Sequence, residues 1–441
     1  MNAASRLLTA LLVCTGFLCV LGRTQEIHPA TAGEDEEFER NANALKPGDE
    51  LVVHSGVYSQ TGRRAITVQG TPDHPIIIRG APGPAPLLTR PAESRVRHNN
   101  IELVDCAHLI IRGLRFQGGS SGVRFIRGHH VTFEGCEVFE TENNALTMNS
   151  GDCHAFVVRG NHIHHTGLSA RGPTEGEGMY IGCHDGGCRT TGSLFEGNYI
   201  HHTRSTSDGG NDGIEIKFGS HGNIVRNNVI HDTNLGRRYP GIFVYGGGPG
   251  TNVVEGNVIW RAGEGIQVVS DAIVRNNIIF DCSAAGITAG PHAAMPQVRN
   301  VAIVHNTIFN APVGVRFGWS GAIQAVFANN AVFCPAGTAI RADGLGAAVF
   351  RNNAVHGRRA GVSMDGQQWL DGGDPTEAFA GPAAHNFWPK PDSPLRERAD
   401  ASCAPPLDFD GFKRGAPFDI GAYETDGRQN PGWAIQGGFK R

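Results

Sequence analysis

The sequence predicts an all-β solenoid, a single-domain parallel β-helix with three short strands in each coil. The first observation is an internal motif that recurs with a period of about 20 to 37 residues, a length that suits one solenoid turn. The second is the alternation of side chains within short β-rich runs that are broken by Asn-Asn or Gly-Asn. The third is the absence of helical periodicity.

The repeated motif is visible in eight copies along the chain. They are Phe156–His165, Leu194–His202, Ile224–Asp232, Val253–Arg261, Ile273–Asp281, Ile303–Asn310, Val326–Phe333 and Val349–His356. A further short strand follows many copies, as in Gly213–Lys217 and Gly241–Tyr245. Stacking the copies in register predicts columns of equivalent side chains along the molecule.

Composition excludes several other classes of protein. The chain has 441 residues with 61 glycines and 18% charged residues, which argues against a coiled coil and against disorder. The net charge is −4 and the basic residues are scattered, so nothing indicates nucleic-acid binding. A local groove for an acidic polymer remains compatible with this charge.

The N-terminus resembles an export signal. Arg6 supplies a positive charge, Leu7–Leu21 an apolar run, and Val20-Leu21-Gly22 a small-residue cleavage site. We therefore expect a signal peptide over residues 1–22 and a secreted or periplasmic, soluble protein. No other segment is apolar enough to span a membrane.

The remaining sequence divides into three parts. Residues 23–45 are expected to cap the N-terminal end, residues 46–371 to form the β-helix, and residues 372–441 to form a C-terminal cap or tail. The repeat fades after about Asp371, where proline becomes frequent. Caps are expected because an open solenoid end exposes core and strand edges.

Ten cysteines are present, and eight of them follow the predicted signal peptide. An exported protein can form disulfides, and Cys183 and Cys188 could close a short loop. Cys153 is a competing partner. A zinc site made of Cys153, Cys183, His184 and Cys188 is an alternative.

Two predicted columns are explained by structure. Stacked asparagines are expected at a tight turn, where asparagine tolerates left-handed backbone and bonds from coil to coil. They are Asn161, Asn198, Asn228, Asn257, Asn277, Asn306, Asn330 and Asn353. Stacked rings are expected as ordinary solenoid packing. They are Phe139, His164, His201, His231, Trp260, Phe280, Phe309, Phe333 and His356.

A third column points to function. Its flanking positions are apolar, so strand alternation turns the apolar residues inward and this column outward. It contains Arg124, Thr147, Tyr180, Glu215, Phe243, Gln267, Thr288 and Arg316, and Lys217 and Tyr245 point the same way. Exposed aromatic and charged side chains on one outer sheet suit a groove for an extended polymer. The alternative is an ordinary solvated face.

Lys217 is the leading candidate within this column. It is the single lysine between Pro47 and Pro389, in a chain whose basic residues are otherwise nearly all arginine. Arginine stays protonated, whereas a lysine can lose its proton and act as a base. Long segments at 169–178, 182–192, 203–213 and 233–240 surround it in the stack. The alternative is a surface lysine paired with Glu215.

The repeat, the Lys46-Pro-Gly-Asp49 segment and the Asp419-Ile-Gly-Ala-Tyr423 segment together resemble exported right-handed parallel β-helix proteins of the pectate-lyase-like superfamily. The stretch Asn211–Arg226 is similar to the segment around the catalytic lysine of family 9 polysaccharide lyases. That resemblance implies that Lys217 is the base and that aspartates hold calcium, with Asp208 and Asp212 as candidates. A looser similarity to the alginate lyase and chondroitinase B group implies an arginine one coil downstream, where Arg237 and Arg238 lie.

The implied reaction is β-elimination in a uronic-acid polymer. A base removes the proton at C5 and the C4 oxygen leaves, which requires positive charge beside the carboxylate. Asp208, Asp212 and Glu215 would bind calcium. Lys217 would act as base, and Arg238 or Tyr180 would hold the carboxylate or protonate the leaving oxygen. The substrate-binding candidates are Glu215, Phe243, Tyr245, Gln267, Arg316 and His184.

Other functions remain open on the same scaffold. A glycoside hydrolase needs two carboxyl groups across the scissile bond, such as Glu215 with Asp212 or Glu177 with Asp185. A C5-epimerase would share the proton abstraction. A non-catalytic protein would only bind carbohydrate. In each case the expected partner of the monomeric protein is an acidic polysaccharide.

Overall fold

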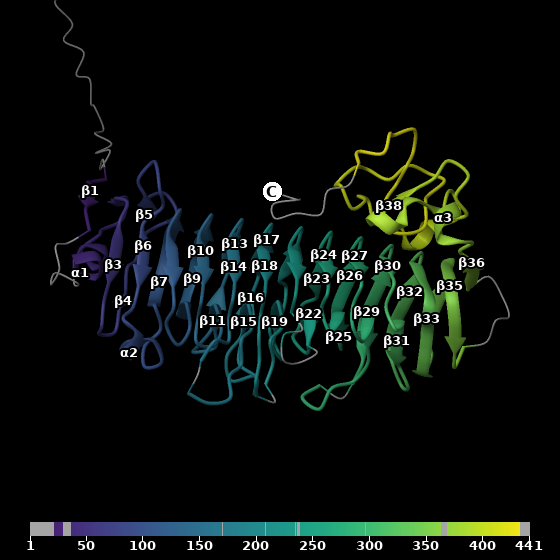
Figure 1. Cartoon of the computed structure of the whole chain (residues 1–441), viewed down its shortest axis with the longest axis horizontal. Helices are drawn as coiled ribbons and strands as arrows, with labels where there is room; N and C mark the ends of the chain where they lie inside the picture. The colour runs from purple at the N-terminus through teal and green to yellow at the C-terminus, as the bar shows by residue number, and fades with distance from the viewer. Residues whose placement is uncertain are drawn as a thin grey trace, which may run out of the picture.

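The computed structural model describes residues 22–29, 37–169, 171–207, 209–233, 235, 239–295, 297–362 and 368–432. Within them, strands β1 to β36 belong to one sheet whose strand pairs are parallel, and the chain passes through three strand columns in each coil. Figure 1 shows the resulting elongated solenoid. The predicted parallel β-helix is thus confirmed.

The first column carries the outward-facing residues singled out in the sequence. Its strands are β4 (Ala65–Ile66), β11 (Leu146–Met148), β15 (Met179–Ile181), β19 (Ile214–Ile216), β22 (Pro240–Val244), β25 (Glu264–Val268), β28 (Ala285–Ala289) and β31 (Val313–Gly318). Two long strands, β7 (Ile101–Arg112) and β9 (Val123–Glu134), run through the corner from this column into the second. The short strands β12 (Cys153–His154) and β16 (Thr190–Thr191) lie at the same corner.

The second column contains β1 (Thr24–Ile27), β2 (Glu50–Val53), β5 (Ile76–Gly80), β13 (Val157–Arg159), β17 (Leu194–Glu196), β20 (Ile224–Arg226), β23 (Asn252–Glu255), β26 (Ala272–Arg275), β29 (Arg299–Val304), β32 (Ile323–Ala328) and β34 (Val349–Arg351). These strands pair from coil to coil. From β13 through β17, β20 and β23 to β26, the pairing shows no change of register.

The third column contains β3 (Val57–Ser59), β6 (Leu87–Thr89), β8 (Arg115–Gln117), β10 (Glu137–Phe139), β14 (His162–His164), β18 (Tyr199–His201), β21 (Val229–His231), β24 (Val258–Trp260), β27 (Ile278–Phe280), β30 (Thr307–Phe309) and β36 (Trp369–Asp371). Near the C-terminal end, β33 (Ala331–Gly344) and β35 (Asn353–Ala360) run from the third column into the first.

Few elements lie outside the coils. Helix α1 (Glu37–Asn43) buries Phe38 and Ala42 in the core at the N-terminal end. The others are α2 (Ala92–Arg95), α3 (Pro375–Ala378), η1 (Pro382–Ala384), η2 (Ala401–Cys403) and the antiparallel pair β37 (Phe379–Gly381) and β38 (Asn386–Pro389). No helix in the described residues is both long enough and apolar enough to cross a membrane. The predicted signal peptide lies almost wholly outside the described residues.

The segment after β36 packs along the side of the solenoid. Phe387 and Trp388 share a buried apolar cluster with Trp260 and Phe280 of the third column. Hydrogen bonds at the adjoining corner fix it, including Ala422 N–H to Thr307 Oγ1 at 3.0 Å. In Figure 1 this yellow segment lies over the C-terminal half of the coils.

The predicted asparagine ladder is present, with one correction to its backbone. Each amide donates to the next side chain, as from Asn228 Nδ2 to Asn257 Oδ1 and from Asn257 Nδ2 to Asn277 Oδ1, both at 2.9 Å. Asn257 is fully buried and also donates to Val225 O. The left-handed backbone belongs to the preceding residue of each turn, such as Gly256 with φ +63°, and not to the ladder asparagines.

The predicted ring column is also present. His201 stacks between His164 and His231 with ring centroids 5.1 and 5.0 Å away, and the stack continues through Trp260 to Phe280. Burial, together with the neighbouring histidines, lowers the pKa of His201 to about 2. This histidine is therefore neutral in the folded protein.

Replacing Asn257 with alanine should destabilise the solenoid. The change removes the Asn257 side chain that donates to Val225 O and accepts from the backbone N–H of Asn228, and each buried group left unpaired costs about 1–3 kcal/mol. The side-chain amide of Asn228 also loses one of its two acceptors and keeps Phe195 O. The denaturant midpoint should fall, while the exposed-site control Asn430→Ala should unfold like wild type. An Asn257→Ala protein as stable as wild type would show that the ladder is not needed for stability.

Replacing His201 with phenylalanine should weaken the acid dependence of stability. His201 is neutral in the folded protein, but below about pH 6.5 it gains a proton when the protein unfolds. Its contribution to the free energy of unfolding is therefore fully present above pH 6.5 and is lost as the pH falls toward 2. The loss is up to about 1.4 kcal/mol per pH unit. Between pH 7 and pH 5, the free energy of unfolding should therefore fall less in His201→Phe than in wild type. The exposed control His74→Phe should behave like wild type. An equal fall in His201→Phe and in wild type would contradict the assignment of His201 as a neutral, buried histidine.

Candidate active site

The column that holds Lys217 is in the predicted register. Glu215 pairs with Tyr180 on one side and with Phe243 on the other, and Phe243 pairs in turn with Gln267. Ile214 and Ile216, which flank Glu215, are fully buried in the main core. The side chains of this column therefore leave the coil on its outer side, as strand alternation requires.

Lys217 follows β19 directly and lies among polar and aromatic groups. Its Nζ donates to Glu215 Oε1 at 2.5 Å and lies 4.3 Å from the centre of the Tyr180 ring and 5.2 Å from that of Tyr245. Burial alone would lower the pKa of Lys217, but Glu215 and Tyr180 outweigh it and hold the pKa above its ordinary value. The amine is thus an ammonium in this arrangement.

Three buried carboxyl groups gather beside the lysine. Glu177 and Asp212 occupy equivalent positions of adjacent coils, each one residue before the glycine that precedes its strand, and Glu215 lies on β19. One oxygen from each lies within 4.8 Å of the others, and the three residues are only 1–3% exposed. We call this set the carboxylate cluster.

The carboxylate cluster is electrostatically unbalanced. Burial raises the pKa of Glu177 and of Asp212 well above the ordinary values, and the charge of Glu215 adds to both effects. Burial also raises the pKa of Glu215, although Lys217 opposes it. Among the described residues, no hydrogen-bond partner lies within reach of the buried atoms Glu177 Oε2, Asp212 Oδ1 and Glu215 Oε2. Buried charges of this kind are normally paired or coordinate a metal.

The donor set of the carboxylate cluster fits a hard divalent cation. Calcium prefers carboxylate and carbonyl oxygens, and the cluster presents three carboxylates with free lone pairs. The sequence prediction named Asp208, Asp212 and Glu215 as ligands. Asp208 lies outside the described residues, and Glu177 joins the other two. The alignment of Glu177-Gly178 with Asp212-Gly213 is the sequence signal that could have identified it.

Phe243 and Tyr245 were expected to be exposed, and the whole column with Glu215 and Lys217 to face solvent. That expectation is wrong for these four buried residues, whereas Tyr180 is partly exposed. Phe243 and Tyr245 are 5% and 3% exposed and form a small apolar cluster with Val269 and Met295. His292, in the turn before Met295, packs against both rings at 5.6 and 4.9 Å. The loop between β28 and β29 therefore covers this part of the column, which is why outward-pointing rings are buried.

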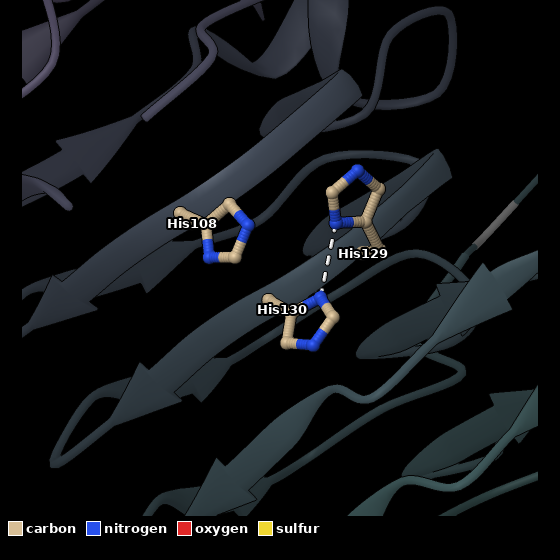
Figure 2. A group of neighbouring side chains, drawn as sticks. All are labelled: His108, His129 and His130. Atoms are coloured by element: carbon tan, nitrogen blue, oxygen red, sulfur yellow. Dashed lines mark hydrogen bonds between the residues drawn. The ribbon is translucent and has the colours of Figure 1, made fainter. Parts of the chain in front are cut away.

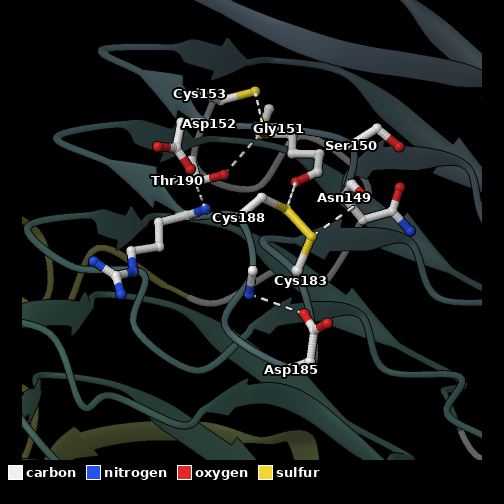
Figure 3. Close-up of a disulfide and its surroundings, with 12 residues drawn as sticks. Asn149, Ser150, Gly151, Asp152, Cys153, Cys183, Asp185, Cys188 and Thr190 are labelled. Carbon is white, nitrogen blue, oxygen red and sulfur yellow. Dashed lines mark hydrogen bonds between the residues drawn. A yellow bond between two sulfur atoms is a disulfide. The ribbon is translucent and has the colours of Figure 1, made fainter.

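A second loop approaches from the other side. His184 lies in the loop between β15 and β16, and its exposed ring is 6.0 Å from that of Tyr245. A disulfide between Cys183 and Cys188 closes this loop, and Figure 3 shows its surroundings. Because Cys183 and Cys188 are bonded to each other, neither can supply a thiolate ligand, which excludes the alternative zinc site. Cys153, the competing partner, is free and buried.

Other predicted site residues lie apart from the lysine. Arg316 is four strands along the column from Glu215, about 19 Å at the usual strand spacing, and pairs with Asp343 at 2.9 Å. Gln267 is half-buried two strands away. Arg238 lies outside the described residues. The structure thus brings together Tyr180, Glu215, Lys217, Tyr245 and Asp212, with Glu177 added.

Several solved structures with a similar fold are named as lyases or epimerases of polysaccharides. An alginate lyase from Paenibacillus sp. str. FPU-7 matches with a TM-score of 0.52 at 21% identity, over 64% of this chain and 95% of its own. Pectate lyase Pel9A matches with a TM-score of 0.52 at 14% identity, over 91% and 96%. The A-module of the Azotobacter vinelandii mannuronan C-5 epimerase AlgE6 matches with a TM-score of 0.51 at 16% identity, over 75% and 93%.

At these identities the likeness shows the fold alone, which is a right-handed parallel β-helix. No match was found among curated proteins. The family model described as "Right handed beta helix region" matches residues 89–207 and 175–332. These matches span more than half of the chain and coincide with the stacked coils, so the protein belongs to the right-handed β-helix family.

Proposed function

We propose that this protein is an exported polysaccharide lyase that cleaves a uronic-acid polymer by β-elimination at Lys217. The observation that carries the proposal is a buried lysine beside three carboxylates with unpartnered oxygens. Proteins of the same fold are named as lyases of alginate and pectate and as an epimerase of mannuronan, which are all polyuronates. The leader expected at residues 1–22 supports export.

The chain's own groups can divide the proton transfers. Lys217 is the nitrogen base for the C5 proton, and it works once its proton has been lost. Burial raises the pKa of Tyr180 to about 12 although the charge of Lys217 opposes it. Burial and the charges of Glu215 and Asp212 raise the pKa of Tyr245 further. Both phenols therefore stay protonated, and the one at Tyr180 is suited to protonate the C4 oxygen as it leaves.

Glu177, Asp212 and Glu215 are the residues that would hold calcium. When bound, the cation supplies positive charge that stabilises a substrate carboxylate and favours the neutral form of the neighbouring amine. Lys217 is only 5% exposed, so a sugar ring can reach it only when the side chains of the two covering loops move aside. His184 and His292 are the residues that such a movement would displace.

Substitution of Lys217 should abolish elimination. Removing a general base typically costs about 100- to 10,000-fold in rate. Lys217→Arg should be as inactive as Lys217→Ala because arginine keeps the charge and cannot serve as a base. The measurement is the ultraviolet absorbance of unsaturated uronate from pectate, alginate and glycosaminoglycans.

The exposed Lys413 provides the matched control for that measurement, since Lys413→Ala should retain full activity. Retained activity in Lys217→Ala would remove the lysine from the mechanism. Reducing ends without unsaturation would indicate a hydrolase. Inverted C5 stereochemistry without cleavage would indicate an epimerase, which shares the same proton abstraction.

Removal of calcium should abolish activity, and readdition should restore it. Glu177→Gln and Asp212→Asn keep the shape of each side chain but remove a charged ligand, so calcium affinity measured by calorimetry should fall by at least about 10-fold. The neighbouring exposed Glu175→Gln should bind calcium like wild type. Unchanged calcium binding in both cluster variants would exclude the carboxylate cluster as the site.

A further inference from the structure

We propose that His108, His129 and His130 form a zinc site on the outer surface of the solenoid, separate from the carboxylate cluster. One ring nitrogen from each histidine lies within 4.8 Å of the others. Figure 2 shows the three rings around one space, with the Nδ1 atoms of His129 and His130 3.0 Å apart. We call this set the histidine triad.

The triad is built by the stacking of two coils. Ala107 on β7 pairs with His129 on β9, so His108 and His130 occupy equivalent positions at the same corner. Both have left-handed backbone, with φ of 46° and 53°, which turns their rings the same way. Their ring centroids are 4.8 Å apart, and the two ring planes are nearly parallel. His129 lies across both of them, 5.3 and 5.2 Å away.

This arrangement suits metal binding better than it suits packing. His129 and His130 are exposed and His108 is half-buried, so no core depends on these rings. Two facing ring nitrogens at 3.0 Å can share only one proton, which makes a doubly protonated pair unfavourable. Burial and the neighbouring histidines also lower the pKa of His130. Neutral imidazole is the form that binds metal.

Three histidines indicate the class of metal. Imidazole nitrogen suits Zn²⁺, Cu²⁺ and Ni²⁺, whereas calcium prefers oxygen. Zinc bonds of about 2.0–2.1 Å require the nitrogens to lie about 3.3 Å apart, which rotation of exposed rings can reach from the present spacing. Three protein ligands leave a fourth position for water. A fourth histidine, His154, lies nearby, with its ring 5.9 Å from that of His130. Its Nδ1 contacts Thr191 Oγ1 at 2.9 Å, and we do not include it in the triad.

Zinc titration of the full chain tests this proposal. Zinc binding is measured by competition with a chromophoric chelator, with excess calcium present to occupy the oxygen-ligand sites. One zinc ion should bind per chain. His108→Asn/His130→Asn should weaken that affinity more than about 100-fold, beyond the effect of losing a group that only orients a ligand through a hydrogen bond. Asparagine is chosen because it tolerates the left-handed backbone at both positions. Cobalt should give a tetrahedral visible spectrum in wild type and lose it in the variant.

Two controls keep the result specific. The variant His74→Asn changes an exposed histidine outside the triad. The variant His162→Gln changes a second cluster, which consists of Glu137, His162 and His164. Both should bind zinc like wild type, and His129→Ala should weaken binding as the double variant does. Unchanged affinity in a double variant that unfolds at the wild-type denaturant midpoint would overturn the proposal. Loss of the zinc only in His162→Gln would also overturn it.

Discussion

The structure depends on the fixed register between coils. Between Asn161 and Asn353 the asparagine ladder ties successive turns together through buried side-chain amides. Along the whole stack, parallel strand pairing makes equivalent positions of successive coils meet at strand spacing. A residue's neighbours in space are thereby set by its place in the repeat. The pairs Glu177 with Asp212 and His108 with His130, far apart in the chain, are both produced in this way.

The carboxylate cluster is the feature that stability alone does not explain. Burial of three carboxyl groups is unfavourable unless each is paired, and Lys217 contacts only one of them at hydrogen-bond distance. Such a group is stabilised by protonation or by a cation. Binding a cation would offset the negative charge that makes the cluster costly in the free protein. In the proposed function, the cluster and the amine act at one site.

The sequence predicted the solenoid, the ladder, the ring stack and the outward column, because each follows from spacing along the chain. It did not predict that Phe243 and Tyr245 are buried, because their cover comes from His292 and Met295 in a loop with no repeat. It also assigned the left-handed turn residue one position late. Glu177 was considered only for hydrolysis, although its glycine neighbour aligns it with Asp212. Loop conformation and contacts across coils decide such details.

A crystal structure of the Lys217→Ala protein with calcium and an oligouronate tests the central claim most directly. The account predicts a cation bound by Glu177, Asp212 and Glu215, a substrate carboxylate beside it, and a C5–H bond directed at the space left by the lysine. The covering loops at His184 and His292 should be displaced. A sugar bound elsewhere on the solenoid, with the carboxylate cluster still enclosed and free of cation, would contradict the account.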